Sequence, residues 1–457
     1  MKKEPITTSI FELFKVGPGP SSSHTIGPMK AAKSFLDICN SLPTETISSA
    51  KSIDVNLYGS LSATGKGHGT DRAVLAGLLN WTPETTDPKE FLNLLIDQNI
   101  NYKIQIGEKT IQFNSSNIHF HKGKFDFPHP NTLTFQIKNE NNLLHEEEYY
   151  SIGGGFIIRK GDSTEQNQKS PKYPYSSMED VKGILEKEKI SLIELILENE
   201  KSISGLSEVE INQKMDSILQ FMHSAVERGI IEDGVLPGSI KLHRKAKYLY
   251  SQAVEHKNKQ EGFLMFLNAY CEAASEENAA GHIVVTAPTS GASGVIPGIT
   301  YLLKKHFEYD QKNIREGMMV AALIGFLVKH NASISGAEMG CMGEIGTASA
   351  MSASMLSYCA GHSVNVIEAA AEIAIEHHLG MTCDPIGGYV QIPCIERNAM
   401  GSVKAYNAYL LACSGNQAYQ KISLDSVIKV MKATGDDMSK KYKETSEAGL
   451  ALSATEC

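Results

Sequence analysis

The spacing of apolar and polar residues divides the chain into a mixed N-terminal part and a helical C-terminal part. In the first part, apolar residues of Ile26–Cys39 share one helical face, and Ser52–Tyr58 alternates polar and apolar residues as a half-buried strand does. A second helix is expected over Asp71–Leu79. The pattern predicts a small α/β layer of roughly five strands and two or three helices. The further strands are expected over Asn101–Ile106, Thr110–Phe113, Thr132–Ile137 and Ile152–Arg159.

The second part, from Met178 onward, shows helical spacing almost throughout, and strand signals are scarce. Between the two parts, residues 161–177 are polar, contain prolines and lack periodicity, which is typical of a linker. We therefore predict an α+β fold, with an N-terminal α/β domain over residues 1–160, a linker over 161–177 and an all-helical domain over 178–457. The expected helices are Met178–Glu200, Ser207–Arg228, Lys241–His256, Gly262–Glu277, Asn313–Lys329, Gly346–Ala360, Asn365–His378 and Met400–Ala412.

Composition narrows the class of protein. A chain of 457 residues is too long for one hydrophobic core. Its net charge of −9, with both signs mixed along the chain, disfavours a nucleic-acid partner. The longest apolar run, Met318–Val328, is too short to cross a membrane, and no apolar stretch follows the charged N-terminus as a signal peptide would require. Eight cysteines without regular spacing do not indicate a disulfide framework, so we expect a reducing, cytoplasmic protein.

Three of these cysteines, Cys341, Cys383 and Cys394, lie in segments rich in glycine, proline and acidic residues. Three thiolates suit an iron–sulfur cluster that leaves one iron open, and an open iron can act as a Lewis acid. The alternative is three buried free thiols, because cysteine is among the most buried residue types. Cys359 is excluded as a partner of Cys341, since one helix joining them would hold them roughly 27 Å apart.

Two hydroxyl-rich segments precede predicted helices. Gly17–Pro28 offers Ser21, Ser22, Ser23 and Thr25 together with His24, and free backbone amides at a helix start can bind a small carboxylate. The alternative is that one hydroxyl merely caps the helix. The second segment, over residues 286–298, places hydroxyls and small residues before an apolar helix, as a substrate loop or a packing turn would; its candidate residues are Thr286, Thr289, Ser290 and Gly291.

A third segment, Tyr58–Arg72, places glycines at 65, 67 and 69 between a strand and a helix, where backbone can approach a ligand closely. The segment does not contain the Gly-x-x-x-x-Gly-Lys-Ser/Thr sequence of a P-loop. His68, between two of these glycines, is expected to be an exposed imidazole on an adaptable loop and suits a general base near neutral pH. The alternative is a solvated loop histidine without a role. The last residue, Cys457, carries an α-carboxylate and a β-thiol, whereas free serine carries an α-carboxylate and a β-hydroxyl. The C-terminal tail could therefore enter a serine site and bind an open iron through its sulfur. The alternative is a frayed terminus whose thiol has no role.

Taken together, these segments resemble the bacterial iron–sulfur L-serine dehydratases, or L-serine ammonia-lyases, in their single-chain form. The resemblance covers nearly the whole chain. Its markers are Gly19–Thr25, Gly65–Asp71, His129–Thr132, Thr286–Gly291 and the three cysteines.

The resemblance implies a [4Fe–4S] cluster held by Cys341, Cys383 and Cys394, a helical catalytic domain and a homodimer. It also implies an N-terminal domain similar to the regulatory substrate-binding domain of some phosphoglycerate dehydrogenases, with His129 and Asn131 in a regulatory serine site. The products would be pyruvate and ammonia, in amino-acid degradation and gluconeogenesis. No pyridoxal phosphate is expected, because the Ser-x-Lys-x-Arg-Gly pattern of the other serine dehydratases is absent.

In the expected reaction, the open iron polarises the C–O bond of L-serine while a base removes the Cα proton. His68 is the first candidate for that base and His24 the second. The alternatives are a hydro-lyase that acts on another small hydroxy acid and a non-catalytic iron–sulfur sensor. A dicarboxylate substrate would need further arginines beside the site, and Arg72 is the only arginine in a marker segment. The sequence does not distinguish L-threonine from L-serine as the substrate. The expected substrate-binding residues are Ser21, Ser22, Ser23, Thr25, Lys66, Thr286, Thr289, Ser290 and Gly291.

Overall fold

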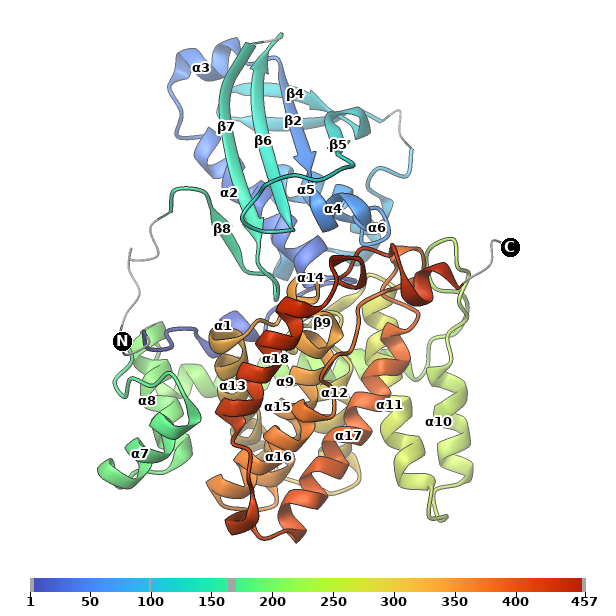
Figure 1. Cartoon of the computed structure of the whole chain (residues 1–457). Helices are drawn as coiled ribbons and strands as arrows, with labels where there is room; N and C mark the ends of the chain where they lie inside the picture. The colour runs from blue at the N-terminus through green and yellow to red at the C-terminus, as the bar shows by residue number, and fades with distance from the viewer. Residues whose placement is uncertain (1–3, 98–99, 141, 163–169, 454–457) are drawn as a thin grey trace.

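The computed structural model describes residues 4–97, 100–140, 142–162 and 170–453. A sheet with helices on one side forms the N-terminal part and stands on a bundle of helices formed by the C-terminal part (Figure 1). This arrangement confirms the predicted α+β fold class. No helix in the described ranges is both long and apolar enough to span a membrane.

The N-terminal sheet has the strand order β5-β2-β6-β7-β8. All neighbouring strands are antiparallel except β2 and β5, which run parallel. Helices α2 (Gly27–Cys39) and α5 (Thr70–Leu78) pack against each other, and α2 also contacts β6, β7 and β8. The strands are β2 (Ser52–Leu57), β5 (Ile118–Phe120), β6 (Thr132–Asn139), β7 (Asn142–Ser151) and β8 (Ile157–Arg159), and a separate hairpin joins β3 (Tyr102–Ile106) to β4 (Lys109–Phe113).

Three strands of this sheet differ from the prediction. The short strand β5 was not expected. Strand β7 was not expected because its run of three glutamates, residues 146–148, hides the apolar alternation; only Tyr149 and Ser151 of the strand are buried. The strand expected over Ile152–Arg159 shortens to β8, because Gly153, Gly154 and Gly155 all take positive φ angles and turn the chain. The other predicted strands form within a few residues of the expected bounds.

In the helical part, α15 (Thr347–Cys359) is buried on every side and packs against α12, α13, α16 and α17. Its alanines and serines allow this close approach of four neighbours. The helices around it are α7 (Met178–Glu188), α8 (Leu192–Ser204), α9 (Glu208–Gly229), α10 (Ala246–Glu255), α11 (Gly262–Ala279), α12 (Val295–Lys305), α13 (Gln311–Asn331), α16 (Val364–Glu376), α17 (Cys394–Ser414) and α18 (Leu424–Asp437).

Most of these helices match the predicted ones. The single helix expected over Met178–Glu200 is instead two, because Lys189 takes a left-handed conformation after α7 and Ser191 caps α8. Helix α10 begins later than expected, at Ala246. Helix α18 was not predicted, although Ser423 caps it and its apolar residues share one face.

The first residues of the chain pack on the helical part before the chain enters the N-terminal sheet. Helix α1 (Ile10–Leu13) is buried in the core of the helical part, and strand β1 (Val16–Pro18) pairs with β9 (Ile283–Val285). The hydroxyl-rich segment that follows β1 therefore starts beside the loop after β9. This pairing brings two of the predicted substrate segments together.

Candidate functional site

The three cysteines singled out by the sequence line one small cavity. Cys341 lies between the short helices α14 (Gly336–Met339) and η4 (Met342–Gly346), Cys383 lies in the loop after α16, and Cys394 is the first residue of α17. All three are buried. Cys341 is 42 positions before Cys383 in the sequence, so the tertiary fold is what brings it to the other two cysteines. The cavity is lined by Ser21, His68, Gly291, Cys341, Glu344, Ile345, Cys383, Pro385, Val390, Cys394 and Glu444.

Backbone contacts fix the loop that carries Cys383. Its N–H donates to the carbonyl of Tyr442 at 2.8 Å, and its carbonyl accepts from the N–H of Glu444 at 2.8 Å. These bonds form a parallel bridge between Cys383 and Lys443. The C-terminal segment is therefore part of the wall of the cavity.

Arg397 supplies positive charge at the cysteines. Its Nη1 lies 3.2 Å from the Sγ of Cys341 and 2.7 Å from the carbonyl oxygen of Thr382, and its Nη2 lies 3.5 Å from the Oδ1 of Asp384. A hydrogen bond with the Cys383 thiol, followed by the charge of Arg397, lowers the pKa of Cys341 to about 7. Burial raises the pKa of Cys394. Cys341 is thus the most readily ionised of the three thiols before any metal binds.

The donor set fits a metal group. Ligand atoms of Cys341, Glu344 and Cys383 lie within 4.8 Å of one another. Cys394 lines the same cavity but is not in this close group of ligand atoms, so all three cysteines border one space. A cluster bound by three thiolates needs this arrangement, because its remaining iron must face open space rather than a fourth protein sulfur.

His68 is buried, which corrects the expectation of an exposed imidazole; it is only 1% exposed. The carbonyl of Thr64 accepts from its Nδ1 at 3.0 Å, which places the ring proton on Nδ1 and leaves Nε2 unprotonated. Nε2 lies 4.0 Å from the Oε1 of Glu444. Burial lowers the pKa of His68 to about 4, so the ring is neutral at neutral pH.

His24 lies next to His68 and is also buried. Its Nε2 lies 3.0 Å from the Oγ of Ser60, and its Nδ1 lies 2.8 Å from the Oγ of Ser23 and 3.5 Å from the Oε1 of Glu444. Burial, and then the neighbouring His68, lower the pKa of His24 well below its usual range. Both ring nitrogens of His24 already have hydroxyl neighbours.

The hydroxyl-rich segment lies beside these histidines, over the short helix η1 (Ser22–Ile26). Ser21 caps this helix, accepting from the N–H of His24 at 3.2 Å, and also lines the cavity. The Oγ of Ser22 accepts from the N–H of Ser290 at 3.3 Å, which joins the two predicted substrate segments. Thr25 donates to the carbonyl of His68 at 2.8 Å and so helps to hold that residue in place.

The other predicted substrate residues divide into two groups. Gly291 lines the cavity, the hydroxyl of Ser290 is buried without a hydrogen-bond partner, and the buried hydroxyl of Thr289 lies beside the Glu344 carboxyl group, whose pKa it lowers. Thr286 instead donates to the carbonyl of Leu13 at 2.6 Å, as a structural link to α1, and Lys66 is exposed. Neither Thr286 nor Lys66 lines the cavity.

His129 and Asn131 lie at the boundary between the two parts of the molecule, outside the cavity. The Nε2 of His129 is 3.9 Å from the Oε1 of Glu338 on α14, and its Nδ1 accepts from the N–H of Asn131 at 3.0 Å. The Nε2 of His129 and the Oδ1 of Asn131 are buried and have no hydrogen-bond partner. Cys457, the remaining predicted site residue, lies outside the described residues.

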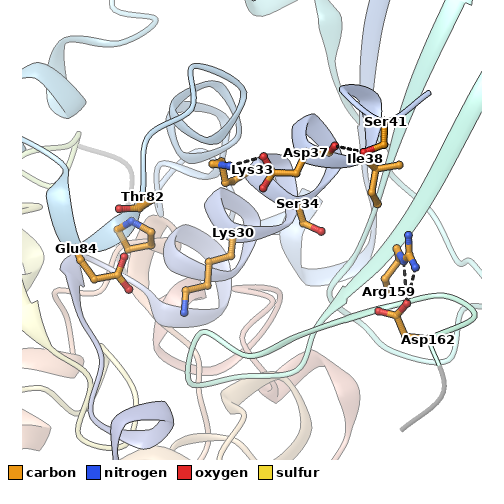
Figure 2. A pocket seen from close by; sticks show the side chains of 11 residues that line it. Lys30, Lys33, Ser34, Asp37, Ile38, Ser41, Thr82, Glu84, Arg159 and Asp162 are labelled. Atoms are coloured by element: carbon orange, nitrogen blue, oxygen red, sulfur yellow. Dashed lines mark hydrogen bonds and ion pairs between the residues drawn. The ribbon is translucent and has the colours of Figure 1, made fainter. Parts of the chain in front are cut away.

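A larger pocket of about 660 Å³ lies against α2, but its chemistry is different (Figure 2). Its charged side chains are largely paired: Lys33 with Asp37 at 2.5 Å, and Arg159 with Asp162 at 2.7 Å. None of the residues predicted for the site lines it. Size alone therefore does not identify the reactive site.

Sequence reasoning missed three residues at the cavity: Glu344, Arg397 and Glu444. Glu344 is half-buried, and the burial of its carboxyl group, followed by the charge of Cys341, raises its pKa to about 8. Burial, Glu344 and Cys341 likewise raise the pKa of Glu444 well above its usual range. Arg397 could have been predicted, because it lies three residues after Cys394 and therefore on the same face of the helix. Glu444 could not have been predicted, because its segment contains no recognisable motif.

Comparison with known proteins gives matches over nearly the whole chain. The serine dehydratase beta chain model matches residues 9–162, and the serine dehydratase alpha chain model matches residues 187–451. An L-serine dehydratase of Haemophilus influenzae is 40% identical over 454 residues, which cover 97% of this chain and 98% of that protein. L-serine dehydratase 2 of Escherichia coli is 39% identical over 458 residues, with 98% and 99% covered. An L-serine dehydratase of Streptomyces coelicolor is 40% identical over 457 residues, with 98% and 99% covered.

Proposed function

The chain belongs to the serine dehydratase family, with the beta-chain and alpha-chain regions joined in one polypeptide, and we propose that it converts L-serine to pyruvate and ammonia. The observation that carries this proposal is the single cavity shared by three cysteines and a buried, neutral histidine. A neutral imidazole and a metal-binding set in one small space suit removal of a weakly acidic proton together with loss of a poor leaving group.

We propose that Cys341, Cys383 and Cys394 hold a [4Fe–4S] cluster. When bound, the cluster would supply an iron without a protein sulfur, a Lewis acid for the serine hydroxyl. The Cys341 thiolate favoured by Arg397 supports this assignment, because thiolates rather than thiols bind iron. Arg397 would also offset part of the negative charge that three thiolates gather in a buried place.

We propose His68 as the base that takes the Cα proton. Its Nε2 has a free lone pair because Nδ1 donates to Thr64, and the residue lines the cavity. His24 is the second candidate, but both of its ring nitrogens lie within hydrogen-bond distance of serine hydroxyls. A role for His24 in holding Ser23 and Ser60 fits its contacts better.

The hydroxyl segments would hold the substrate. Ser21 and Gly291 line the cavity, and the unpartnered hydroxyl of Ser290 and the neighbouring hydroxyl of Thr289 could bond to the substrate carboxylate. We propose that Ser22, Ser23 and Thr25 keep the histidines and the Ser290 loop in place. His68 would take the Cα proton and return it to the departing hydroxyl, so that water leaves and aminoacrylate remains. Aminoacrylate would then react with water to give pyruvate and ammonia after release.

Three further features stay proposals. We propose that the chain works as a homodimer in the cytoplasm, that His129 and Asn131 belong to a regulatory serine site, and that Cys457 binds the open iron in the resting enzyme. The Nε2 of His129 and the Oδ1 of Asn131 are buried without hydrogen-bond partners, which supports a ligand at the regulatory serine site.

The proposal is tested by anaerobic purification, a count of iron and sulfide, and a pyruvate assay. We expect iron and sulfide in equal amounts, and pyruvate from L-serine but not from D-serine. A 2-oxo acid formed faster from L-threonine than from L-serine would identify the threonine-specific alternative. Colourless, metal-free protein with full activity on L-serine would disprove the role of the cluster.

A further inference from the structure

Two carboxylates face each other in the cavity beside the cysteines. Both Glu344 and Glu444 line it. A methyl group at Gly336 would come within 2.8 Å of the Oε2 of Glu344 and 3.4 Å of the Oε2 of Glu444, so both oxygens approach the same point.

Among the described residues, no lysine or arginine forms an ion pair with either carboxyl group, although the charge of Arg397 partly lowers the pKa of Glu344. Glu344 forms no ion pair within the described ranges, and Glu444 approaches only His24 and His68, at 3.5 Å and 4.0 Å. Arg397 is directed to Cys341, Thr382 and Asp384 instead. The Oε2 of Glu444 is buried and has no hydrogen-bond partner. A buried oxygen without a hydrogen-bond partner lowers the stability of the fold unless a ligand donates a hydrogen bond to it.

The backbone of Glu444 is fixed in an unusual conformation. Its φ angle is +59°, in the left-handed region that residues with a side chain rarely adopt. Its N–H donates to Cys383, and its carbonyl accepts from the Oγ of Ser60 at 2.7 Å. These bonds, one to each part of the molecule, hold the carboxylate in the cavity. Strain of this kind persists where the surroundings impose it, often at functional sites.

We infer that Glu444, with Glu344 beside it, forms the subsite for the α-ammonium group of the substrate, and that this pair makes the site select α-amino acids over acids without an amine. This inference rests on the proposed function. An ammonium group donates three hydrogen bonds, and its positive charge would favour the ionised form of two carboxyl groups whose pKa values are otherwise raised. Glu344 and Glu444 are the two acidic side chains among the residues that line the cavity.

The test measures binding of two unreactive probes to the anaerobic holoenzyme by calorimetry. L-alanine is serine without the hydroxyl, and propionate is L-alanine without the ammonium. We expect the parent protein to prefer L-alanine by about tenfold or more, as a charge-assisted hydrogen bond gives. Glu444→Gln should lose most of this preference while retaining its propionate affinity and cluster absorption. Glu447→Gln, an exposed glutamate of the same segment, is the matched control and should keep the preference.

An unchanged preference in Glu444→Gln would overturn the inference. If that variant does not assemble, Glu344→Gln is measured in the same way: a weakened preference supports the inference and an unchanged one overturns it. The proposed function is judged separately, by whether the parent protein forms pyruvate from L-serine. A parent that forms pyruvate, with a variant that still prefers L-alanine, would reject the ammonium subsite alone.

Discussion

The imidazole rings of His24 and His68 lie 4.5 Å apart and are tilted by 38°. Both face the same Glu444 carboxylate, and both are buried. Two protonated rings so close would repel each other, which adds to the effect of burial in keeping them neutral. The hydrogen bonds then separate their roles: His24 is held between Ser23 and Ser60, while His68 keeps one nitrogen free for a proton.

Removal of the proposed base should abolish turnover without loss of the cluster. We expect His68→Ala and His68→Gln to lower kcat by about 10²–10⁴-fold, the usual contribution of a general base. His119→Gln, at a partly exposed histidine of β5, should behave like the parent protein. Visible spectra, iron content and pyruvate formation are measured together. Near-normal kcat in either His68 variant would reject the assignment.

The pH dependence of activity should reflect the buried state of His68. Because the pKa of His68 is lowered to about 4, its base form persists as pH falls through 6.5, where an exposed histidine would become protonated. We expect the acid limb of the kcat/KM profile for L-serine to lie well below pH 6. An inflection near pH 6.5 that disappears in His68→Gln would show that the ring titrates as an exposed one.

The three cavity cysteines should be needed for iron, and the other buried cysteines should not. We expect Cys341→Ser, Cys383→Ser and Cys394→Ser each to lose most of the iron, the brown colour and the activity. Cys359→Ser is the control: this buried thiol contacts the carbonyl of Asn313, and burial raises its pKa to about 12. Full iron content in any of the first three variants would remove that cysteine from the ligand set.

The C-terminal cysteine should affect the start of the reaction rather than its steady rate. If Cys457 binds the open iron at rest, Cys457→Ala should abolish a slow or lagging phase and change the resting spectrum. Cys413→Ala, a partly exposed cysteine at the end of α17, should leave both unchanged. Progress curves are recorded after rapid mixing with L-serine. Identical curves and spectra in Cys457→Ala and the parent would rule out the resting ligand.

Local patterns predicted most of the architecture, and each failure has an identifiable structural cause. The helices α9, α11 and α13 formed where apolar residues recur at helical spacing. The single predicted helix after Met178 split because Lys189 adopts a left-handed conformation that its sequence does not signal. Strand β7 was not predicted, because it is largely polar and is stabilised by pairing with β6 and β8. Such pairing is a property of the sheet and not of the segment.

The reactive groups could be predicted without a fold, because thiols, hydroxyls and histidines in glycine-rich and proline-rich segments are recognisable without their partners. These groups are Cys341, Cys383 and Cys394, and the segments around His24, His68 and Ser290. Their environment, in contrast, depends on the folded chain. The burial of His68 and the entry of Glu444 into the cavity depend on long-range contacts, such as the bridge between Cys383 and Lys443. Charge and pKa depend on what surrounds a group, and here most of the surroundings come from distant parts of the chain.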